Sequence, residues 1–415
     1  MKNRYIPTAF GLYLNYLVHG MGVILMSLNM QHLEQQWHTD AAGVSVVISS
    51  LGIGRLSLLL IAGTLSDRFG RKPFVYLGIA CYLVFFLGVL GTTNIVVAYC
   101  FGVLAGMANS FLDSGTYPSL MEAFPDSPGT ANILIKAFIS GGQFLLPLVI
   151  SILVWADLWF GWSFLLAASI MMLNAVCLFR YPFPPSRSQP NRAERVDKTG
   201  LIDTKSSPTR VEKEHHTCAM LDLASFTLFG YIAMATFYLI SQWLSQYGQF
   251  VVGIPYEMSI KLLSIYTIGS LFGVVITAGL ARSNTHSSLV LICCTFLSFI
   301  SLLVVCLYPS VKVVIIFAFV IGFSAAGGVL QLGLTLMALR FPYAKGKATA
   351  IYYSAGSLAT FTIPLVTARL SQVSIASIMW FDVGLAAAGF LTALFIGYRD
   401  MEARRCSVSM NQLGA

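Results

Sequence analysis

The residues of this chain best suited to bind a solute or carry a proton are four ionisable side chains inside long apolar stretches of its first half. They are His19, Arg55, Asp113 and Lys136. A charge in the middle of a lipid bilayer costs about 3 kcal/mol or more, so such residues persist mainly where they bind a solute, carry a proton or pair with one another. A guanidinium or ammonium group binds anions, whereas a carboxylate or an imidazole takes up and releases protons.

Polar residues recur at helical spacing around these ionisable side chains. Asn15 precedes His19 by four residues, and Asn109 precedes Asp113 by four. Residues four apart lie on one face of a helix, so each pair is expected to share a polar surface. The solute-binding residues predicted in the first half are Asn15, His19, Arg55, Asn109, Lys136 and Gln143, and the predicted proton-coupling residues are Asp113 and His19.

A structural alternative stands beside each of these roles. In it, Asp113 forms a fixed ion pair with Arg55 or Lys136, because unpaired charges are rare inside a bilayer. His19 is then a histidine that only completes the packing. A functional ion pair would differ from a fixed one by exchanging partners when a solute binds.

The second half offers hydrogen-bonding and stacking side chains in place of most charges. Tyrosine and glutamine suit a hydroxylated or ring-bearing solute. Taken singly, each such residue is more often a packing residue or a link between helices. The solute-binding residues predicted in this half are Tyr231, Tyr238, Gln242, Gln331, Tyr352 and Tyr353.

These residues lie on segments that are apolar enough to cross a membrane. The 415 residues are 57% hydrophobic and 10% charged, with a mean hydropathy of +0.77, whereas a soluble protein carries about 25% charged residues. Each apolar run is long enough to cross a hydrocarbon core of roughly 30 Å as a helix. The predicted spans are about 7–31, 41–63, 73–91, 94–120, 129–154, 157–179, 220–247, 257–281, 287–307, 311–338, 346–370 and 375–397.

Basic residues between the spans predict the orientation. With both termini in the cytoplasm, 20 of the 25 lysines and arginines lie inside and only Lys312 and Arg369 lie outside, which is a strong positive-inside bias. A charged, proline-rich segment divides the chain and is predicted to be a solvated cytoplasmic linker. The predicted domains are an N-terminal six-helix bundle at 1–180, the linker at 181–217, a C-terminal six-helix bundle at 218–398 and a cytoplasmic tail at 399–415.

The two halves carry a weak internal repeat. At a shift of 217 residues, Phe124 falls on Phe341 and Pro147 falls on Pro364. Duplicated halves are typical of transporter folds. The sequence therefore predicts an all-α membrane protein with twelve transmembrane helices in two pseudo-symmetric six-helix bundles.

A charged loop follows the second predicted span. Residues 63–72 read Gly-Thr-Leu-Ser-Asp-Arg-Phe-Gly-Arg-Lys, and this pattern resembles the G-x-L-x-D-R-x-G-R-K signature of the major facilitator transporters. The resemblance implies the major facilitator fold and secondary transport by alternating access. Gly63 would let helices approach closely, and Asp67 would cap a helix or pair with a cation. The residues assigned to this conformational gate are Gly63, Asp67, Arg68, Gly70 and Arg71.

The chain also departs from patterns within that family. Gly102 stands where many proton-coupled members carry an arginine, and residues 140–147 lack the Gly-Pro motif of antiporters. Multidrug antiport is therefore less favoured, and proton symport lacks its usual arginine. The stretches 50–57, 107–113, 341–349 and 351–357 resemble the enterobacterial YdiM/YdiN-type inner-membrane transporters, whose genes often lie near quinate/shikimate dehydrogenase genes.

Other classes of protein fit the sequence less well. It carries no Walker A pattern, zinc motif or nucleophile elbow, so neither an enzyme nor a self-contained ATP-driven pump is expected, and no cofactor or metal. The alternative of another class is a non-transporting membrane receptor, but no soluble signalling domain stands outside the spans.

The expected function is secondary active transport, by proton-coupled symport of a hydroxylated carboxylate such as quinate or shikimate. A neutral sugar is the first alternative substrate and multidrug efflux the next. The expected partners are a small-molecule substrate, protons and the lipid bilayer, with no nucleic acid. We expect a monomer in the bacterial inner membrane.

Overall fold

The computed structural model describes residues 4–125, 128–184, 210–282, 287–326, 329–341 and 345–413, and the elements assigned within these ranges are all helices. The first half contains α1 (Ile6–Leu28), α2 (Met30–Trp37), α3 (Ala41–Phe69), α4 (Arg71–Gly91), α5 (Ile95–Ala123), α6 (Pro128–Trp155) and α7 (Trp162–Arg180). The second half contains α8 (Arg210–Phe250), α9 (Tyr256–Arg282), α10 (Ser287–Leu307), α11 (Val311–Ile321), the π-helical η2 (Gly322–Ala326), α12 (Val329–Arg340), α13 (Lys345–Ser371) and α14 (Ile375–Leu413). The all-α prediction is confirmed.

Eleven segments within the described residues are long and apolar enough to cross a membrane. One of them, Val311–Arg340, comprises α11, η2 and α12. The remaining predicted span corresponds to α13, a helix of 27 residues in which serine, threonine and tyrosine lower the hydropathy. These segments are consistent with the predicted twelve spans.

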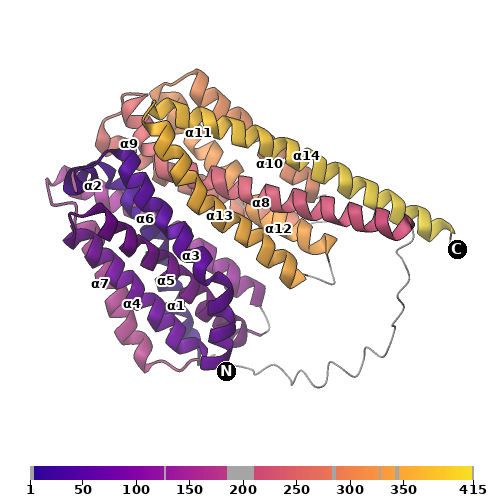
Figure 1. Cartoon of the computed structure of the whole chain (residues 1–415), viewed down its shortest axis with the longest axis horizontal. Coiled ribbons are helices and arrows are strands. Elements are labelled where there is room, and N and C mark those ends of the chain that lie inside the picture. The colour runs from indigo at the N-terminus through magenta and orange to yellow at the C-terminus, as the bar shows by residue number, and fades with distance from the viewer. Residues whose placement is uncertain are drawn as a thin grey trace.

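The helices form two groups that lie side by side, α1–α7 and α8–α14, here called the first and second group (Figure 1). In the first group, α5 packs against α3 and α4, and α1 packs against α6. In the second group, α8 packs against α13 and α14, and α10 packs against α14. The two groups meet through α3 with α13, α6 with α9 and α1 with α8.

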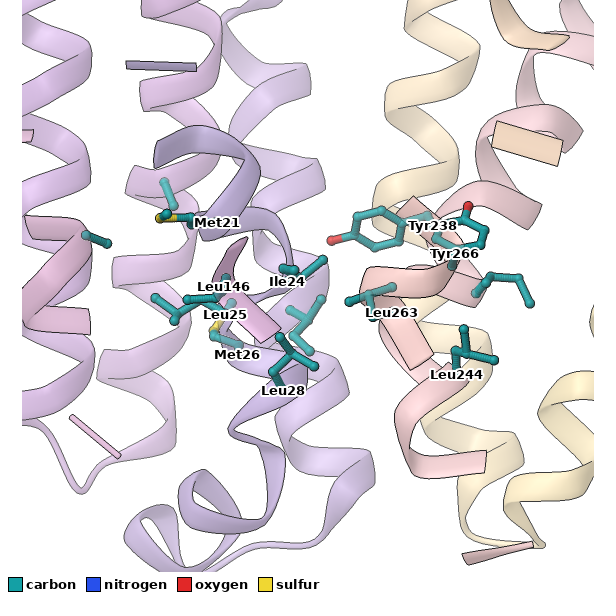
Figure 2. Packing of buried hydrophobic residues seen from close by; sticks show 14 of the residues in the cluster. Met21, Ile24, Leu25, Met26, Leu28, Leu146, Tyr238, Leu244, Leu263 and Tyr266 are labelled. Carbon is teal, nitrogen blue, oxygen red and sulfur yellow. The ribbon is translucent and has the colours of Figure 1, made fainter. Parts of the chain in front are cut away.

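Apolar packing joins the groups at one end. Ile24 and Leu28 of α1 are buried and belong to the same core as Leu263 of α9, and Figure 2 shows them facing one another across the interface. Lipid tails are as apolar as these side chains, so close packing rather than transfer from water holds such helices together.

Hydrogen bonds reinforce this end, where α1, α6, α8 and α13 finish and α3 and α9 begin. Gln246 donates to the backbone oxygen of Ser27, and the Tyr256 hydroxyl donates to that of Leu28 at 2.9 Å. Further bonds here join Ser45 to Pro364, Gln242 to Val23, Gln31 to Gln249 and Ser264 to Phe144. We call this the closed end; the helix ends that flank the linker, at α7 and α8, lie opposite.

Glycines allow the closest approaches between helices. A Cβ on Gly52 of α3 would lie 2.3 Å from the backbone nitrogen of Phe361 of α13. At Gly63, by contrast, a Cβ would meet nothing within 4 Å. The close approach predicted at Gly63 is therefore wrong for this conformation: Ala62 and Ser66 carry the buried face of α3 here, whereas Gly63 lies outside that face, as do the exposed Ile61 and Leu65.

The structure also changes the expected limits of the linker. Helix α8 begins at Arg210, inside the segment 181–217 predicted to be a solvated linker. A helix already formed in a span continues into polar residues at little cost when they are good helix formers, as Glu and Lys are. Residues 185–209 lie outside the described residues, and the domain limits at 180 and 218 stay a prediction.

Candidate solute-binding site

A cavity of about 730 Å³ lies between the two groups and is lined by side chains from both. Helices α1, α3, α4, α5 and α6 line it from the first group, and α8, α9, η2, α12 and α13 from the second. Its volume is in the range of small-molecule sites. The predicted site residues that line it are His19, Arg55, Asn109, Asp113, Lys136, Gln143, Tyr238, Gln331, Tyr352 and Tyr353.

The charged centre of this cavity is an ion pair between Arg55 and Asp113. Arg55 Nη2 lies 3.2 Å from Asp113 Oδ2, and the two side chains are 20% and 19% exposed. The Tyr16 hydroxyl donates to the other carboxylate oxygen at 2.6 Å. Arg55 Nε has no hydrogen-bond partner among the described residues, so the guanidinium is incompletely paired.

Two glycines bring α3 and α5 close enough to form this pair. A Cβ on Gly106 would lie 2.7 Å from the backbone nitrogen of Arg55, and a Cβ on Gly54 would lie 3.1 Å from Gly106 Cα. The Ser110 hydroxyl donates to the Arg55 backbone oxygen at 2.9 Å. Close packing at Gly106 thus sets the distance between the residues of the ion pair.

Lys136 is a second cation on the cavity wall. Among the described residues it has no ion-pair partner. A lysine in this position presents a positive charge to whatever occupies the cavity, so the ammonium group is available to an anion.

His19 faces the same cavity and is held by neutral aromatic partners. Its Nδ1 is hydrogen-bonded to the Tyr82 hydroxyl, and its ring lies edge-on to Tyr16 with the centroids 5.8 Å apart. The charges of Asp113 and Lys136 both act on it. This geometry fits the structural alternative, and the proton-coupling role of His19 stays a prediction.

The second group supplies neutral polar groups. Gln331 Nε2 lies 3.5 Å from the Tyr353 hydroxyl, and the Tyr352 hydroxyl donates to the Leu330 backbone oxygen at 2.8 Å. The Tyr238 hydroxyl has no partner among the described residues, and Figure 2 shows it directed towards the first group. The two walls of the cavity therefore differ in chemistry, with charges on one and hydroxyl and amide groups on the other.

Three predicted residues do not line the cavity. Asn15 accepts a hydrogen bond from Asn174 Nδ2 at 2.7 Å, which joins α1 to α7. The Tyr231 hydroxyl is 2.7 Å from the Thr362 hydroxyl, and Gln242 donates to a backbone oxygen of α1 at 2.9 Å. In this conformation these side chains link helices rather than face a solute.

The predicted gate motif forms a local network at the end opposite the closed end. Gly70 has a φ of 92°, a left-handed conformation that favours glycine and allows the turn between α3 and α4. Arg71 pairs with Asp67 and, at 3.4 Å, with Glu122 of α5. The Arg68 guanidinium lies over the ring of Phe69, the next residue in the chain. Asp67 is thus paired with a cation here, and its role in gating stays a prediction.

Three residues with roles in the structure were not predicted from the sequence: Tyr16, Tyr82 and Asp382. Tyr16 and Tyr82 hold the ionisable side chains of the cavity, and Tyr16 could have been found because it precedes His19 by three residues on one helical face. Asp382 is a carboxylic residue inside the last apolar run, which was itself a signal. Tyr82 has no comparable signal, because its contact depends on how α4 packs.

Helices of this length and apolarity, arranged in two groups around a central cavity, define a membrane transporter rather than an enzyme. The chain belongs to the Major Facilitator Superfamily, whose sequence profile matches residues 12–290. A second profile, described as PUCC protein, matches residues 189–392.

Two inner-membrane transport proteins of this family are similar to the chain over nearly its whole length. The chain is 67% identical over 405 residues to "Inner membrane transport protein YdiM" of Escherichia coli, covering 98% of this chain and 97% of that protein. It is 35% identical over 395 residues to "Inner membrane transport protein YdiN" of Escherichia coli, covering 95% and 90%. The predicted relation to YdiM/YdiN-type transporters is confirmed.

The fold also matches a solved structure. A crystal structure of a D-xylose-proton symporter aligns with a TM-score of 0.76 at 15% sequence identity, covering 95% of this chain and 97% of the other. At this identity the match shows a shared fold.

Proposed function

We propose that the chain is a proton-coupled symporter of a hydroxylated carboxylate, of the quinate or shikimate kind, that works by alternating access. The observation that carries the proposal is the Arg55–Asp113 ion pair on the wall of the central cavity. Lys136 adds a second cation on the same wall. Two cations suit an anionic solute, and the carboxylate can take up a proton.

In the proposed cycle, the solute competes with Asp113 for Arg55. As the solute carboxylate approaches the guanidinium, Asp113 loses its cationic partner and its protonation becomes favourable. The Tyr16 hydroxyl, already bonded to Asp113 at 2.6 Å, keeps the side chain in place. One anion and one proton enter together, so the net charge of the cavity does not change, and Arg55 stays paired with the solute carboxylate while the helices rearrange.

The neutral wall would bind the hydroxyl groups of the solute. Gln331, Tyr353 and Tyr238 offer amide and hydroxyl groups to it. The same groups suit a neutral sugar, and a D-xylose-proton symporter shares the fold. A neutral sugar is therefore the second candidate substrate.

We place the chain in the bacterial inner membrane as a monomer, with both termini in the cytoplasm and the closed end at the periplasmic face. Arg71 begins α4 and Arg340 ends α12 at the opposite end, and Arg399 shares Asp222 with Arg340 there. These positions support this orientation by the positive-inside rule. The structure is then sealed towards the periplasm, and this end opens when α8 and α9 move away from α1 and α6.

Uptake into proteoliposomes tests the proposal. Quinate, shikimate and D-xylose would each be offered with and without an inward proton gradient. We expect the gradient to drive accumulation of a carboxylate, and Arg55→Gln to weaken its binding about 10- to 100-fold, since a hydrogen bond to a charged group contributes about 1.5–3 kcal/mol. Lys312→Gln is the matched control, because Lys312 is exposed and outside the cavity lining. Accumulation of D-xylose alone, unaffected by Arg55→Gln, would refute the carboxylate proposal and favour the sugar.

A further inference from the structure

A second buried carboxyl group lies in the second group of helices, away from the central cavity. Asp382 of α14 is 0% exposed, and neither of its carboxyl oxygens has a hydrogen-bond partner among the described residues. Ile378 and Met379, which precede it on α14, are fully buried in the apolar core. Asp382 does not line the cavity, and the proposed transport cycle does not use it.

Three helices face this carboxyl group. Helix α8 brings Thr236, whose hydroxyl comes near without a hydrogen bond of good geometry. Helix α9 brings Tyr266, whose hydroxyl also lacks a partner among the described residues, and α10 brings Cys306. Tyr266 and Cys306 are the titratable groups that the described parts of these helices turn towards Asp382. None of the described lysines, arginines or histidines forms an ion pair with it.

Asp222 shows how the same group of helices accommodates an ionised carboxylate. It is 3% exposed, and it pairs with Arg340 at 2.6 Å and with Arg399 at 2.8 Å. Asp382 is at least as buried and has neither partner. Because an unpaired carboxylate in apolar surroundings is strongly disfavoured, whereas a carboxylic acid is tolerated, the two sites call for different protonation states.

We propose that Asp382 is a proton-binding site that controls the closed end. In this conformation a proton taken from water is bonded to one carboxyl oxygen and sealed among α8, α9, α10 and α14. When α8 and α9 move away from the first group and from α10 and α14, water reaches the carboxyl group and accepts that proton, leaving a hydrated carboxylate.

The link to the closed end is structural. Helix α8 carries Gln242 and Gln246, and α9 carries Tyr256, and all three side chains bond to α1 across the interface. The same two helices contribute Thr236 and Tyr266 to the surroundings of the carboxyl group. If this end opens by a movement of α8 and α9 relative to α10 and α14, that movement changes the solvation of Asp382, so proton binding and closure are coupled equilibria. The site needs no solute and stands whether or not the proposed substrate is correct.

Infrared spectroscopy of the full-length protein in lipid nanodiscs tests the protonation state directly. We expect a carbonyl band of a protonated carboxyl group at neutral pH that weakens as the closed end opens at alkaline pH, is lost in Asp382→Asn and shifts in Asp382→Glu. Asp222→Asn is the matched control and should keep the band, because Asp222 is paired with arginines. A spectrum without such a band, or a band that Asp382→Asn and Asp382→Glu both leave unchanged, would overturn the proposal.

A distance measurement tests the control of the closed end. Spin labels at positions 93 and 310, both exposed near this end, would report its opening in a background free of native cysteines. Above about pH 7, where an ordinary histidine such as His32 is neutral, we expect the closed-to-open ratio of the parent protein to fall by up to about tenfold per pH unit. Asp382→Asn should stay closed across that range. An identical pH response in parent and variant would refute the control role.

Discussion

The substitution Asp113→Asn asks whether the ion pair in the cavity exchanges partners. The variant keeps the shape of the side chain and an oxygen to accept from Tyr16, but it removes the negative charge beside Arg55. Unit charges 3.2 Å apart attract by about 1 kcal/mol in water and about 5 kcal/mol at an effective dielectric constant near 20. Each side chain is about one-fifth exposed and desolvation opposes the attraction, so the net competition that an anion must overcome is about 1.5 kcal/mol.

Removing that competition should tighten binding of a carboxylate solute about tenfold while abolishing accumulation driven by a pH gradient. Calorimetry of the purified protein would measure both the affinity and the proton uptake, the latter from the dependence of the heat on the buffer's ionisation enthalpy. The parent protein should take up a proton on binding and the variant should not. If affinity, proton uptake and accumulation were all unchanged, the pair would be a fixed structural bridge and the reasoning would fail.

Three further predictions concern the closed end and the fold. Burial lowers the pKa of His32 below its ordinary value of 6.5 in this conformation, so the closed state binds a proton at His32 less well than an open state would. Acidification through pH 6.5 should therefore open the closed end, and His32→Phe should remove this response in spin-label distances. A response that persists in the variant would exclude His32 as its source. Gly52→Ala places a Cβ 2.3 Å from the backbone of Phe361 and should populate the open form, whereas Gly63→Ala, whose Cβ meets nothing within 4 Å, should not. Equal spin-label distances in the two variants would contradict this prediction. Asp222→Asn removes the buried carboxylate that pairs with Arg340 and Arg399, whose side chains are 35% and 18% exposed. It should cost about 2 kcal/mol of stability, seen as a lower unfolding temperature in detergent, and an unchanged temperature would show that these pairs add nothing.

The polar face of α5 was predictable because a helix in lipid fixes its own periodicity. Asn109 and Asp113 are four residues apart, and both line the cavity. The partner of Asp113 was open between two cations, because Arg55 is 58 positions away along the chain and its approach depends on how α3 packs against α5. Spacing within one helix assigns a face, whereas a contact between helices requires the tertiary structure.

Residue type alone was a weaker guide in the second half. Tyr231 and Tyr238 belong to the same helix, yet one hydroxyl meets Thr362 and the other faces the first group. The span predicted as one helix over 311–338 contains the π-helical η2. A Cβ on Gly322 would lie 1.9 Å from the backbone oxygen of Tyr266, so α9 and η2 approach too closely for any side chain at that position. This requirement for glycine is imposed by a neighbouring helix, so no pattern in the sequence around position 322 predicts it.

The kind of bonds at the closed end determines how small a change in free energy can shift this protein between its closed and open states. Its hydrogen bonds join neutral groups, mostly a side chain to a backbone oxygen as at Gln246 and Tyr256, and each contributes about 1 kcal/mol net. Each ion pair between described side chains joins residues of the same group. A difference of one pH unit in the proton affinity of a carboxyl group is equivalent to about 1.4 kcal/mol, comparable with one of these bonds. Strong ion pairs between the groups would fix one state, whereas weak neutral bonds leave two states within a few kcal/mol, as the proposed alternating access requires. Binding a single proton or solute is therefore enough to decide whether this end is open.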